Sequence, residues 1–350
     1  MANKDSKDNS RKVTASDVAA RAGVSKWTVS RAFTAGAYIS PASMKLVMKA
    51  AQELGYRPNL LARSLTKKRS GIVGLVVDEF SNHNILQVLG EVTRQLQRKG
   101  YSTMLLNINV DHSYEPALLL ADQFQVDGVI FLGAVLPDEF VHLIKEIRHI
   151  PLIVLYRDSS MPGIHVVNAD DFRAGEEIAE LFLHQGYRRM GYMAGPPSGS
   201  TRLERVVGFK AALERNGLGL DLLLEAGAYQ QQRGYETLTD YLKTTANTDR
   251  VDAIFCENDS LAIGALDALR NWGQGVEIAI VGFDGIELAG YSSYNLTTYR
   301  PPIEQLAGEA IGKLDSGGEE ESRFIAPGQL VLRKSHLKGG RQTGKPPYHL

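Results

Sequence analysis

Several polar side chains near the N-terminus have the chemistry needed to read DNA. Arg31 can donate two hydrogen bonds to a guanine edge, and Lys26 can make a similar contact in the major groove. Thr28 and Ser30 carry short hydroxyls that suit phosphate oxygens. Trp27 leaves two interpretations open, because its ring can stack on a sugar or thymine methyl group or cover the core of the surrounding helices. The alternative for the whole set is a solvated helix face.

A second set of side chains has the chemistry of a small-molecule site. Two arginines, an acid, amides and an aromatic ring suit a hydroxylated ligand such as a sugar or a sugar acid. Most of these residues follow segments of strand type, and ligands of open α/β sheets bind beyond the carboxyl ends of strands. The candidate ligand-binding residues are Asn84, Ile85, Tyr156, Arg157, Arg205, Tyr229, Asn258 and Asp284.

Some residues of this region also have a structural interpretation. Asp284 could cap the turn that follows it, and Arg205 could pair with Glu204 at the surface. Asp259 is interpreted as a helix cap rather than a ligand contact. The residues that remain open between the two roles are His83 and Arg202.

The chain lacks the motifs of common enzyme classes. It has no Gly-x-Ser-x-Gly nucleophile elbow, and the loop at 195–200 lacks the Gly-Lys pair of a phosphate-binding loop. None of the eight histidines has the spacing that places two zinc ligands on one helix. The single cysteine, Cys256, rules out a disulfide framework or a multi-cysteine metal site. We therefore expect no catalysis, no cofactor and no metal.

The charge is distributed unevenly along the chain. The formal net charge is −1, yet residues 1–70 hold 14 Lys or Arg and four Asp or Glu, while the remaining 280 residues hold 25 bases and 36 acids. A basic end on an acidic body favours contact between the first 70 residues and a polyanion, and the alternative is a solvated basic tail. Because no apolar run is long enough to span a membrane and no signal peptide is visible, we expect a soluble, cytoplasmic protein.

Capping residues divide the N-terminal region into three short helices. The first helix begins after Thr14 and ends at Gly23, and Ser25, two residues later, caps the second helix. Two short helices joined by a tight turn that contains glycine, with a cationic outer face on the second, indicate a helix-turn-helix. Ser40 followed by Pro41 opens a third helix. The buried stripe expected on this helix comprises Met44, Val47, Met48, Ala51 and Leu54.

A marginal helix is predicted after these three. Asn59 could cap a helix of about two turns, which is too short to be stable alone in water. Such a helix would order only when a second copy of the chain and DNA pack against it. Leu65 would then wedge between base pairs in the minor groove.

Residues 71–334 alternate apolar segments of strand length with amphipathic segments of helix length. This pattern predicts parallel sheets covered on both faces and arranged as two lobes. The expected strands are 72–77, 103–108, 128–132, 152–155, 190–194, 253–256 and 278–282. The expected helices are 85–99, 115–125, 138–147, 172–185, 203–216, 232–242 and 260–270.

Short motifs run through the whole N-terminal region. They are Val13-Thr14, Asp17-Val18-Ala19, Ala22-Gly23-Val24-Ser25, Thr28-Val29-Ser30-Arg31, Leu54-Gly55-Tyr56-Arg57-Pro58-Asn59 and Ala62-Arg63-Ser64-Leu65. In these motifs the chain resembles the LacI/GalR family of bacterial transcription regulators. The resemblance implies that Lys26, Trp27 and Arg31 read bases and that Leu65 intercalates at the operator centre, whereas Thr34 departs from the family's usual asparagine. The candidate DNA-binding residues are Thr14, Ser25, Lys26, Trp27, Thr28, Ser30, Arg31, Tyr38, Asn59, Ala62 and Leu65.

For the body of the chain the resemblance implies a type I periplasmic-binding-protein-like core. Arg205, which stands before Gly208-Phe209, resembles the family's inducer-clamping arginine. Asp284 resembles the carboxylate that takes ligand hydroxyls, and Tyr229 matches an aromatic residue that stacks on a ring. Tyr156 departs from the family, which usually has an acid there. The edge Ser81-Asn82-His83-Asn84-Ile85 departs as well, because the family's segment is more apolar.

The resemblance also implies a domain organisation. The fold class is α/β, with a three-helix helix-turn-helix headpiece and a hinge helix before the two-lobed core. The implied parts are a disordered tail (1–12), the headpiece (13–58), the hinge helix and linker (59–70), the effector-binding and dimerisation domain (71–334) and a flexible tail (335–350). Lobe 1 is about 71–167 plus 299–326 and lobe 2 about 168–298 plus 327–334, with chain crossings near Val167, Thr298 and Pro327.

The implied function is sequence-specific transcriptional regulation, of repressor type, with operator affinity controlled by an effector bound between the lobes. The expected partners are a pseudo-palindromic double-stranded DNA operator, a sugar or sugar acid, and a second copy of the chain in a homodimer, with no membrane. Two other classes of protein share part of this organisation. A solute-binding transport receptor would need an export signal and no basic headpiece, and an architectural DNA-binding protein would need no cleft. The sequence leaves open whether the effector releases or tightens DNA.

Overall fold

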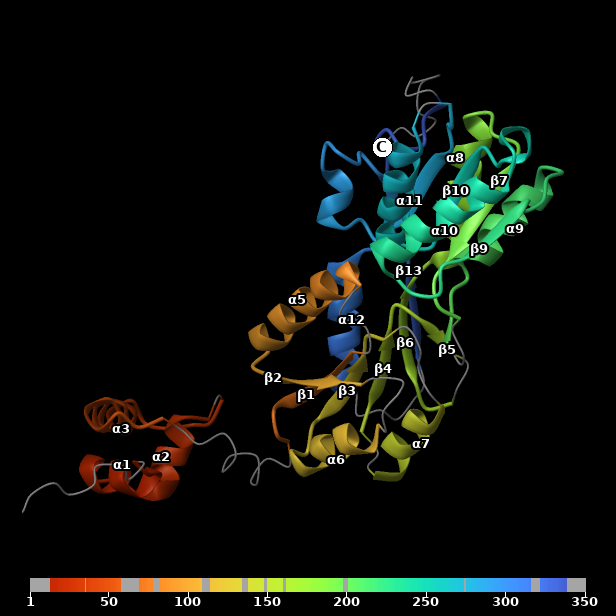
Figure 1. Cartoon of the computed structure of the whole chain (residues 1–350). Helices are drawn as coiled ribbons and strands as arrows, with labels where there is room; N and C mark the ends of the chain where they lie inside the picture. Colours follow the sequence, from red (N-terminus) through yellow and green to blue (C-terminus); the bar gives the residue numbers. More distant parts are fainter. Residues whose placement is uncertain are drawn as a thin grey trace, which may run out of the picture. The chain divides into compact units, whose positions relative to one another are not determined.

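The chain divides into two compact units, Met1–Ser70 and Gly71–Leu350, in the computed structural model (Figure 1). The described residues are 13–34, 36–57, 69–77, 82–108, 114–133, 138–147, 150–159, 162–197, 201–273, 275–315 and 322–338. The predicted tail at 1–12, the hinge residues Asn59, Ala62 and Leu65, and residues 339–350 lie outside them.

The N-terminal unit contains three helices, α1 (Ala15–Ala22), α2 (Lys26–Ala32) and α3 (Pro41–Leu54). The Thr14 side chain accepts from the Asp17 backbone N–H while the Asp17 carboxylate accepts from the Thr14 backbone N–H, which completes a capping box at the start of α1. After α1 the chain reverses at a glycine with φ 68°, a left-handed conformation in which a side chain would be strained. These local signals therefore set the two-helix turn that the sequence predicts.

A small apolar core holds the three helices together. Val18 of α1, Val29 of α2 and Val47 of α3 are fully buried and belong to one cluster. Met48, which the sequence analysis placed in this core, is instead 47% exposed, and Leu46 is 51% exposed. Because α1 and α2 are short, they cover only a narrow stripe of α3, and Met48 lies one position beyond that stripe.

The body of the chain contains two six-stranded sheets. The sheet of lobe 1 has the order β13-β6-β4-β3-β1-β2 and is parallel throughout. Its strands are β1 (Ile72–Val77), β2 (Ser102–Asn107), β3 (Gly128–Phe131), β4 (Leu152–Leu155), β6 (His165–Ala169) and β13 (Arg323–Ala326). Its helices are α5 (His83–Arg98), α6 (Glu115–Gln123), α7 (Asp138–Ile147) and α12 (Ile303–Asp315).

The sheet of lobe 2 has the order β14-β12-β11-β10-β7-β9, with the edge strand β14 antiparallel to its neighbour. Its strands are β7 (Met190–Ala194), β9 (Leu222–Glu225), β10 (Ala253–Cys256), β11 (Ala279–Phe283), β12 (Thr297–Arg300) and β14 (Gln329–Val331). Its helices are α8 (Asp171–His184), α9 (Arg205–Arg215), α10 (Gln231–Thr244) and α11 (Asp259–Trp272), with short 3-10 turns at Asn247–Asp249 and Glu287–Gly290. Two further strands, β5 (Asp158–Ser159) and β8 (Thr201–Arg202), pair with each other in antiparallel fashion.

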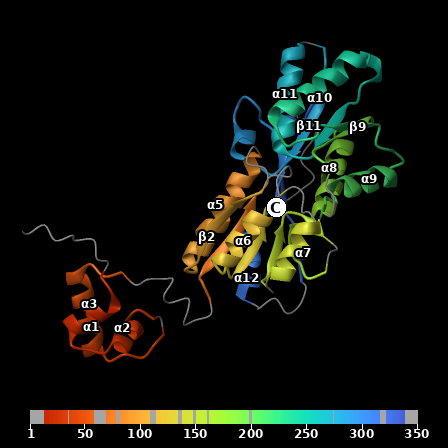
Figure 2. The same ribbon diagram turned by 60° about the horizontal axis from the view of Figure 1, so that its bottom comes forward.

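Helices cover both faces of each sheet, as the apolar strands predict. In lobe 2, α10 and α11 pack together on one face and α8 and α9 on the other (Figure 2). Two successive residues of β10 show this clearly, because Ile254 belongs to the cluster under α10 and α11 while Phe255 belongs to the cluster with α8 and α9. Within the described residues no helix has both the length and the apolar character needed to cross a membrane.

The chain passes between the lobes at three neighbouring places in the described residues. It leaves lobe 1 after β6, returns between β12 and α12, and crosses again between β13 and β14. The sequence pattern does not predict β6, β9, β12, β13, β14 or α12. The strand ends that precede these crossings lie close to the predicted positions at Val167, Thr298 and Pro327.

Candidate functional site

One cavity is lined by all eight predicted ligand-binding residues. Its volume is about 40 Å³, and lobe 1 and lobe 2 both contribute to its lining. The lining residues are Asn82, Asn84, Ile85, Val88, Leu132, Gly133, Leu155, Tyr156, Arg157, Arg205, Tyr229, Asn258 and Asp284. Asn84 and Asp284, which are 200 positions apart in the chain, thus meet where strands of the two sheets have their carboxyl ends.

A hydrogen bond joins the two lobes inside this cavity. The Asn84 side-chain amide, at the start of α5, donates to Asp284 Oδ1 at 2.9 Å. Asp284 follows β11 with φ 119°, and it is 95% buried. Burial, together with the neighbouring Asp259 carboxylate, raises the pKa of Asp284 well above its ordinary value. Asp284 therefore accepts from Asn84 in surroundings that favour its protonated form more than water does.

A buried ion pair fixes Arg205 in the cavity wall. Two guanidinium nitrogens of Arg205 contact Asp171 Oδ1 at 2.9 and 3.2 Å, and a third donates to the backbone oxygen of Glu257 at 2.7 Å. The guanidinium carbon lies 3.5 Å from the centre of the Phe283 ring. Burial alone would lower the pKa of Arg205, but the Asp171 carboxylate raises it, so the guanidinium stays charged. The surface pairing with Glu204 that the sequence allowed is wrong.

Two glycines allow α8 and α9, which carry Asp171 and Arg205, to pack closely. A side chain at Gly175 of α8 would lie 2.0 Å from the Arg205 backbone oxygen, and one at Gly208 of α9 would lie 1.9 Å from the Phe172 backbone oxygen. The two helices therefore touch backbone to backbone, which is possible only where a glycine has no Cβ. This close approach places Arg205, at the start of α9, beside Asp171, at the start of α8. Asp171 is not among the residues predicted from the sequence.

A second polar group orients Tyr229. Arg157 donates to the Tyr229 hydroxyl at 3.2 Å, and that hydroxyl in turn donates to the Glu257 carboxylate. Tyr192 donates to the other oxygen of Glu257 at 2.8 Å. A Cβ at Gly195 would lie 2.2 Å from the Tyr229 ring, so the ring rests directly on the glycine backbone. Neither Glu257 nor Tyr192 was predicted, because their importance comes from partners distant in the sequence.

Three buried polar atoms in the cavity lining lack a hydrogen-bond partner among the described residues. They are Asn84 Oδ1, the Tyr156 hydroxyl oxygen and Asn258 Nδ2. Asn258 caps α11 by accepting from the Leu261 backbone N–H at 2.9 Å, which leaves its amide nitrogen available. Buried polar atoms are nearly always paired in proteins. An acceptor, a hydroxyl and a donor that converge on one cavity are therefore the groups that a bound polar molecule would satisfy.

The remaining residues singled out in this region have other roles. The helix cap of α11 is Asn258 rather than Asp259, so the interpretation of Asp259 as a cap is wrong. Asp259 accepts from the Ile286 backbone at 2.9 Å and from the Thr298 hydroxyl at 2.6 Å, and burial raises its pKa to about 7. His83 lies outside the cavity lining, 3.5 Å from the Ser260 hydroxyl. The Arg202 side chain is outside the described part of the structure.

The surface of α2 carries the predicted base readers. Trp27 is 67% exposed, which excludes the interpretation that its ring covers the core. Lys26 and Ser30 are exposed, and Arg31 is half-buried with its guanidinium carbon 4.3 Å from the Trp27 ring centre. Within the described residues no acid forms an ion pair with Lys26 or Arg31. The cationic side chains of α2 are therefore available to an anionic partner.

The other DNA-binding candidates of this unit divide into caps and an exposed ring. Ser25 caps α2 by accepting from the Thr28 backbone N–H at 3.1 Å, and the hydroxyls of these two residues lie 2.9 Å apart. Thr14 caps α1, and Tyr38 is 80% exposed. Thr34, the position that departs from the family pattern, donates its hydroxyl to the Ser30 backbone oxygen at 2.9 Å. The hydroxyls of Ser25, Thr28 and Thr34 thus already have partners within the unit.

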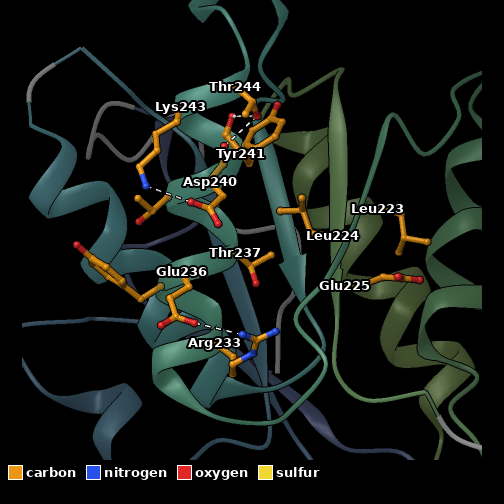
Figure 3. A pocket seen from close by; sticks show the side chains of 12 residues that line it. Leu223, Leu224, Glu225, Arg233, Glu236, Thr237, Asp240, Tyr241, Lys243 and Thr244 are labelled. Atoms are coloured by element: carbon orange, nitrogen blue, oxygen red, sulfur yellow. Dashed lines mark hydrogen bonds and ion pairs between the residues drawn. The ribbon is translucent and has the colours of Figure 1, made fainter.

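A larger hollow of about 760 Å³ lies elsewhere on lobe 2, between β9 and α10 (Figure 3). Its charged side chains pair locally, Arg233 with Glu236 at 3.2 Å and Lys243 with Asp240 at 3.1 Å. None of the predicted ligand-binding residues lines it. Size alone therefore does not identify the site, and the small cavity between the lobes is the better candidate.

Known protein families match both the N-terminal unit and the body of the chain. The model of "Bacterial regulatory proteins, lacI family" matches residues 14–59, and the model of "Periplasmic binding proteins and sugar binding domain of LacI family" matches residues 70–309. The chain is 30% identical over 336 residues to the HTH-type transcriptional regulator AscG of Escherichia coli strain K12. The alignment covers 93% of this chain and 98% of AscG.

Two solved structures are similar over most of their length. One is the Lac repressor dimer bound to operator and the anti-inducer ONPF, with a TM-score of 0.80, 24% identity, and coverage of 94% of this chain and 100% of that one. The other is the complex of the transcriptional regulator CelR with cellobiose, with a TM-score of 0.66, 25% identity, and coverage of 93% and 100%. The LacI family, which both descriptions name, is one of regulators rather than enzymes. The chain belongs to the LacI family of bacterial regulatory proteins.

Proposed function

We propose that this protein is a repressor whose affinity for a DNA operator changes when an uncharged, hydroxylated effector binds between lobe 1 and lobe 2. The observation that carries the proposal is the cavity itself. Eight residues predicted from sequence line it, both lobes contribute, and three of its buried polar atoms lack partners among the residues that the structure describes. A polyhydroxylated ring supplies donors and acceptors at several points, which matches three orphaned atoms of different kinds.

The charges around the cavity favour a neutral sugar over a sugar acid. Arg205 is neutralised by Asp171, and Arg157 is hydrogen-bonded to Tyr229, whose hydroxyl reaches Glu257. A ligand carboxylate would have to compete with these internal partners. Asp284 lines the cavity and offers carboxyl oxygens that can accept a hydrogen bond from a ligand hydroxyl. CelR, a related regulator, is known in complex with a sugar, cellobiose.

The small volume of the cavity couples ligand binding to lobe movement. A volume of about 40 Å³ holds a few water molecules, whereas ligand pockets are typically about 300–1,000 Å³. A sugar therefore enters only if the lobes move apart and the Asn84–Asp284 hydrogen bond breaks. Because lobe 1 carries the connection to the headpiece at Gly71, a change in lobe angle would alter how two headpieces are presented to DNA. By linkage, DNA would change effector affinity by the same factor, typically about 5- to 150-fold.

The exposed apolar side chains of lobe 1 support assembly as a homodimer. The edge strand β2 presents Leu105, 50% exposed, and the neighbouring helices present Leu86 on α5, 55% exposed, and Phe124 beyond α6, 45% exposed. An open sheet edge with apolar neighbours is normally covered. Two headpieces about one DNA turn apart would then read a pseudo-palindromic operator. Since bacterial DNA lies in the cytoplasm, we place the protein there.

The deciding experiment is a fluorescence-anisotropy titration of operator DNA with and without sugars. The operator is first selected from a pool of random duplexes by the full-length protein, and neutral sugars are then compared with their acids at fixed salt. We expect at least one neutral sugar to shift the operator titration and the corresponding acid to have less effect. Complete silence of the panel in both anisotropy and calorimetry would instead favour an architectural DNA-binding protein. An unchanged response after Arg205→Ala and Asp284→Ala would show that the effector binds elsewhere.

A further inference from the structure

We propose that Trp27 takes part in DNA recognition through Arg31, by holding the guanidinium where it can read a base edge. Trp27 is then a positioning residue for Arg31 and not an independent reader of its own base pair. The inference rests on the proposed function, because it requires α2 to meet DNA.

The geometry of α2 places the two side chains on one helix face. They are four residues apart, a spacing at which helical side chains are neighbours. The Arg31 guanidinium carbon lies 4.3 Å from the centre of the Trp27 ring, well within the range of about 6 Å for a cation–π interaction. With the ring 67% exposed, the core of the unit does not account for its position. Neither an acid nor a second ring pairs with Arg31 in the part of the chain that the structure describes.

The contact between Trp27 and Arg31 would reduce the conformational entropy that Arg31 loses when it binds guanine. A bidentate contact between arginine and guanine requires one side-chain conformation out of many, so that binding normally loses conformational entropy. A ring that holds the guanidinium before DNA arrives removes part of that loss. The N–H groups that point away from the ring stay available for the base edge. DNA also excludes water from the pair, and cation–π interactions strengthen when they are desolvated.

The test is a double-mutant cycle on an operator selected by the full-length wild-type protein from random duplexes. Trp27→Leu, Arg31→Met and the double variant are titrated against the operator and against single base-pair substitutions of it. We expect Trp27→Leu to reduce discrimination at the base pair that Arg31→Met also affects, by between about 2-fold and 30-fold, the range of cation–π strengths. In the Arg31→Met background the same change should have little further effect.

Rescue and control variants separate this role from a general one. Trp27→Tyr and Trp27→Phe keep a ring and should restore most of the discrimination, in the order of their cation–π strength. Leu46→Ala removes an exposed side chain of α3, 51% exposed, and should leave base preference unchanged. Because Trp27 is exposed, its variants should unfold at the wild-type temperature, which circular dichroism verifies.

Two results would overturn the inference in different ways. If Trp27→Leu changes preference at a different base pair, and does so equally with and without Arg31, then Trp27 reads that base directly and the inference alone is lost. If the wild-type protein enriches no sequence from the pool, the proposed function fails and the inference falls with it.

Discussion

Removing the carboxylate of Asp171 should strongly destabilise the body of the protein. Its side chain and that of Arg205 are 2% and 5% exposed, and they meet at 2.9 Å. Within the described part of the chain, Asp171→Ala would leave the buried guanidinium charge with one hydrogen-bond acceptor, the backbone oxygen of Glu257. Breaking a buried pair in this way typically costs about 3–5 kcal/mol. For a domain of this size the loss corresponds to a fall in Tm of roughly 10 °C.

The measurement is thermal and urea unfolding of the full chain, followed by circular dichroism. A matched control lies on the same helix, because Arg173 and Glu177 form a pair at 2.8 Å whose side chains are 58% and 22% exposed. Glu177→Ala should cost less than about 1 kcal/mol, since exposed ion pairs contribute little. The double variant Asp171→Leu with Arg205→Met removes both charges and should recover much of the loss. If Asp171→Ala costs no more than Glu177→Ala, the ion pair does not hold α8 and α9 as described.

Three further predictions concern pH and close packing. Burial lowers the pKa of His336 to about 4 from its ordinary 6.5, so the unfolded chain binds the proton more readily than the folded chain. The stability that neutral His336 contributes is therefore complete above pH 6.5 and should be lost progressively as the pH falls toward 4. Unfolding of wild type and His336→Asn across this range checks it, and parallel pH curves would contradict it. Gly208→Ala should cost at least about 1–3 kcal/mol by forcing α9 away from the Phe172 backbone, and an unchanged urea midpoint would contradict that close approach. Gly195→Ala should displace the Tyr229 ring and lower effector affinity about 2- to 10-fold in calorimetry, whereas wild-type affinity would mean that the ring does not contact the effector.

Strand ends were the most informative feature of the sequence. Tyr156, Asn258 and Asp284 each stand at or just beyond the end of an apolar run, so their convergence at one edge follows from the parallel topology alone. The caps and glycines of α1, α2 and α3 were equally readable, because they act within a few residues of chain.

Features that depend on contacts between distant segments were not readable. Asp171 and Glu257 matter because packing brings each of them to a partner from another element, and no local pattern marks them. Strand β12 was missed because its buried face contains hydroxyls. Thr297 and Thr298 look polar in the sequence, yet both are fully buried and hydrogen-bonded, Thr297 to His336 and Thr298 to Asp259. A count of apolar residues cannot find a strand whose polar groups are satisfied by tertiary contacts.

The Asn84–Asp284 hydrogen bond has a kinetic consequence. If a sugar can bind only to molecules in which this bond is open, the observed association rate is the intrinsic rate multiplied by the open fraction. The apparent dissociation constant is then weaker than the intrinsic one by the same fraction. The rate constant observed by stopped flow should consequently stop rising at high sugar concentration and approach the rate constant at which the protein opens. The regulator's response time to a sudden supply of sugar would be set by its own opening and not by diffusion.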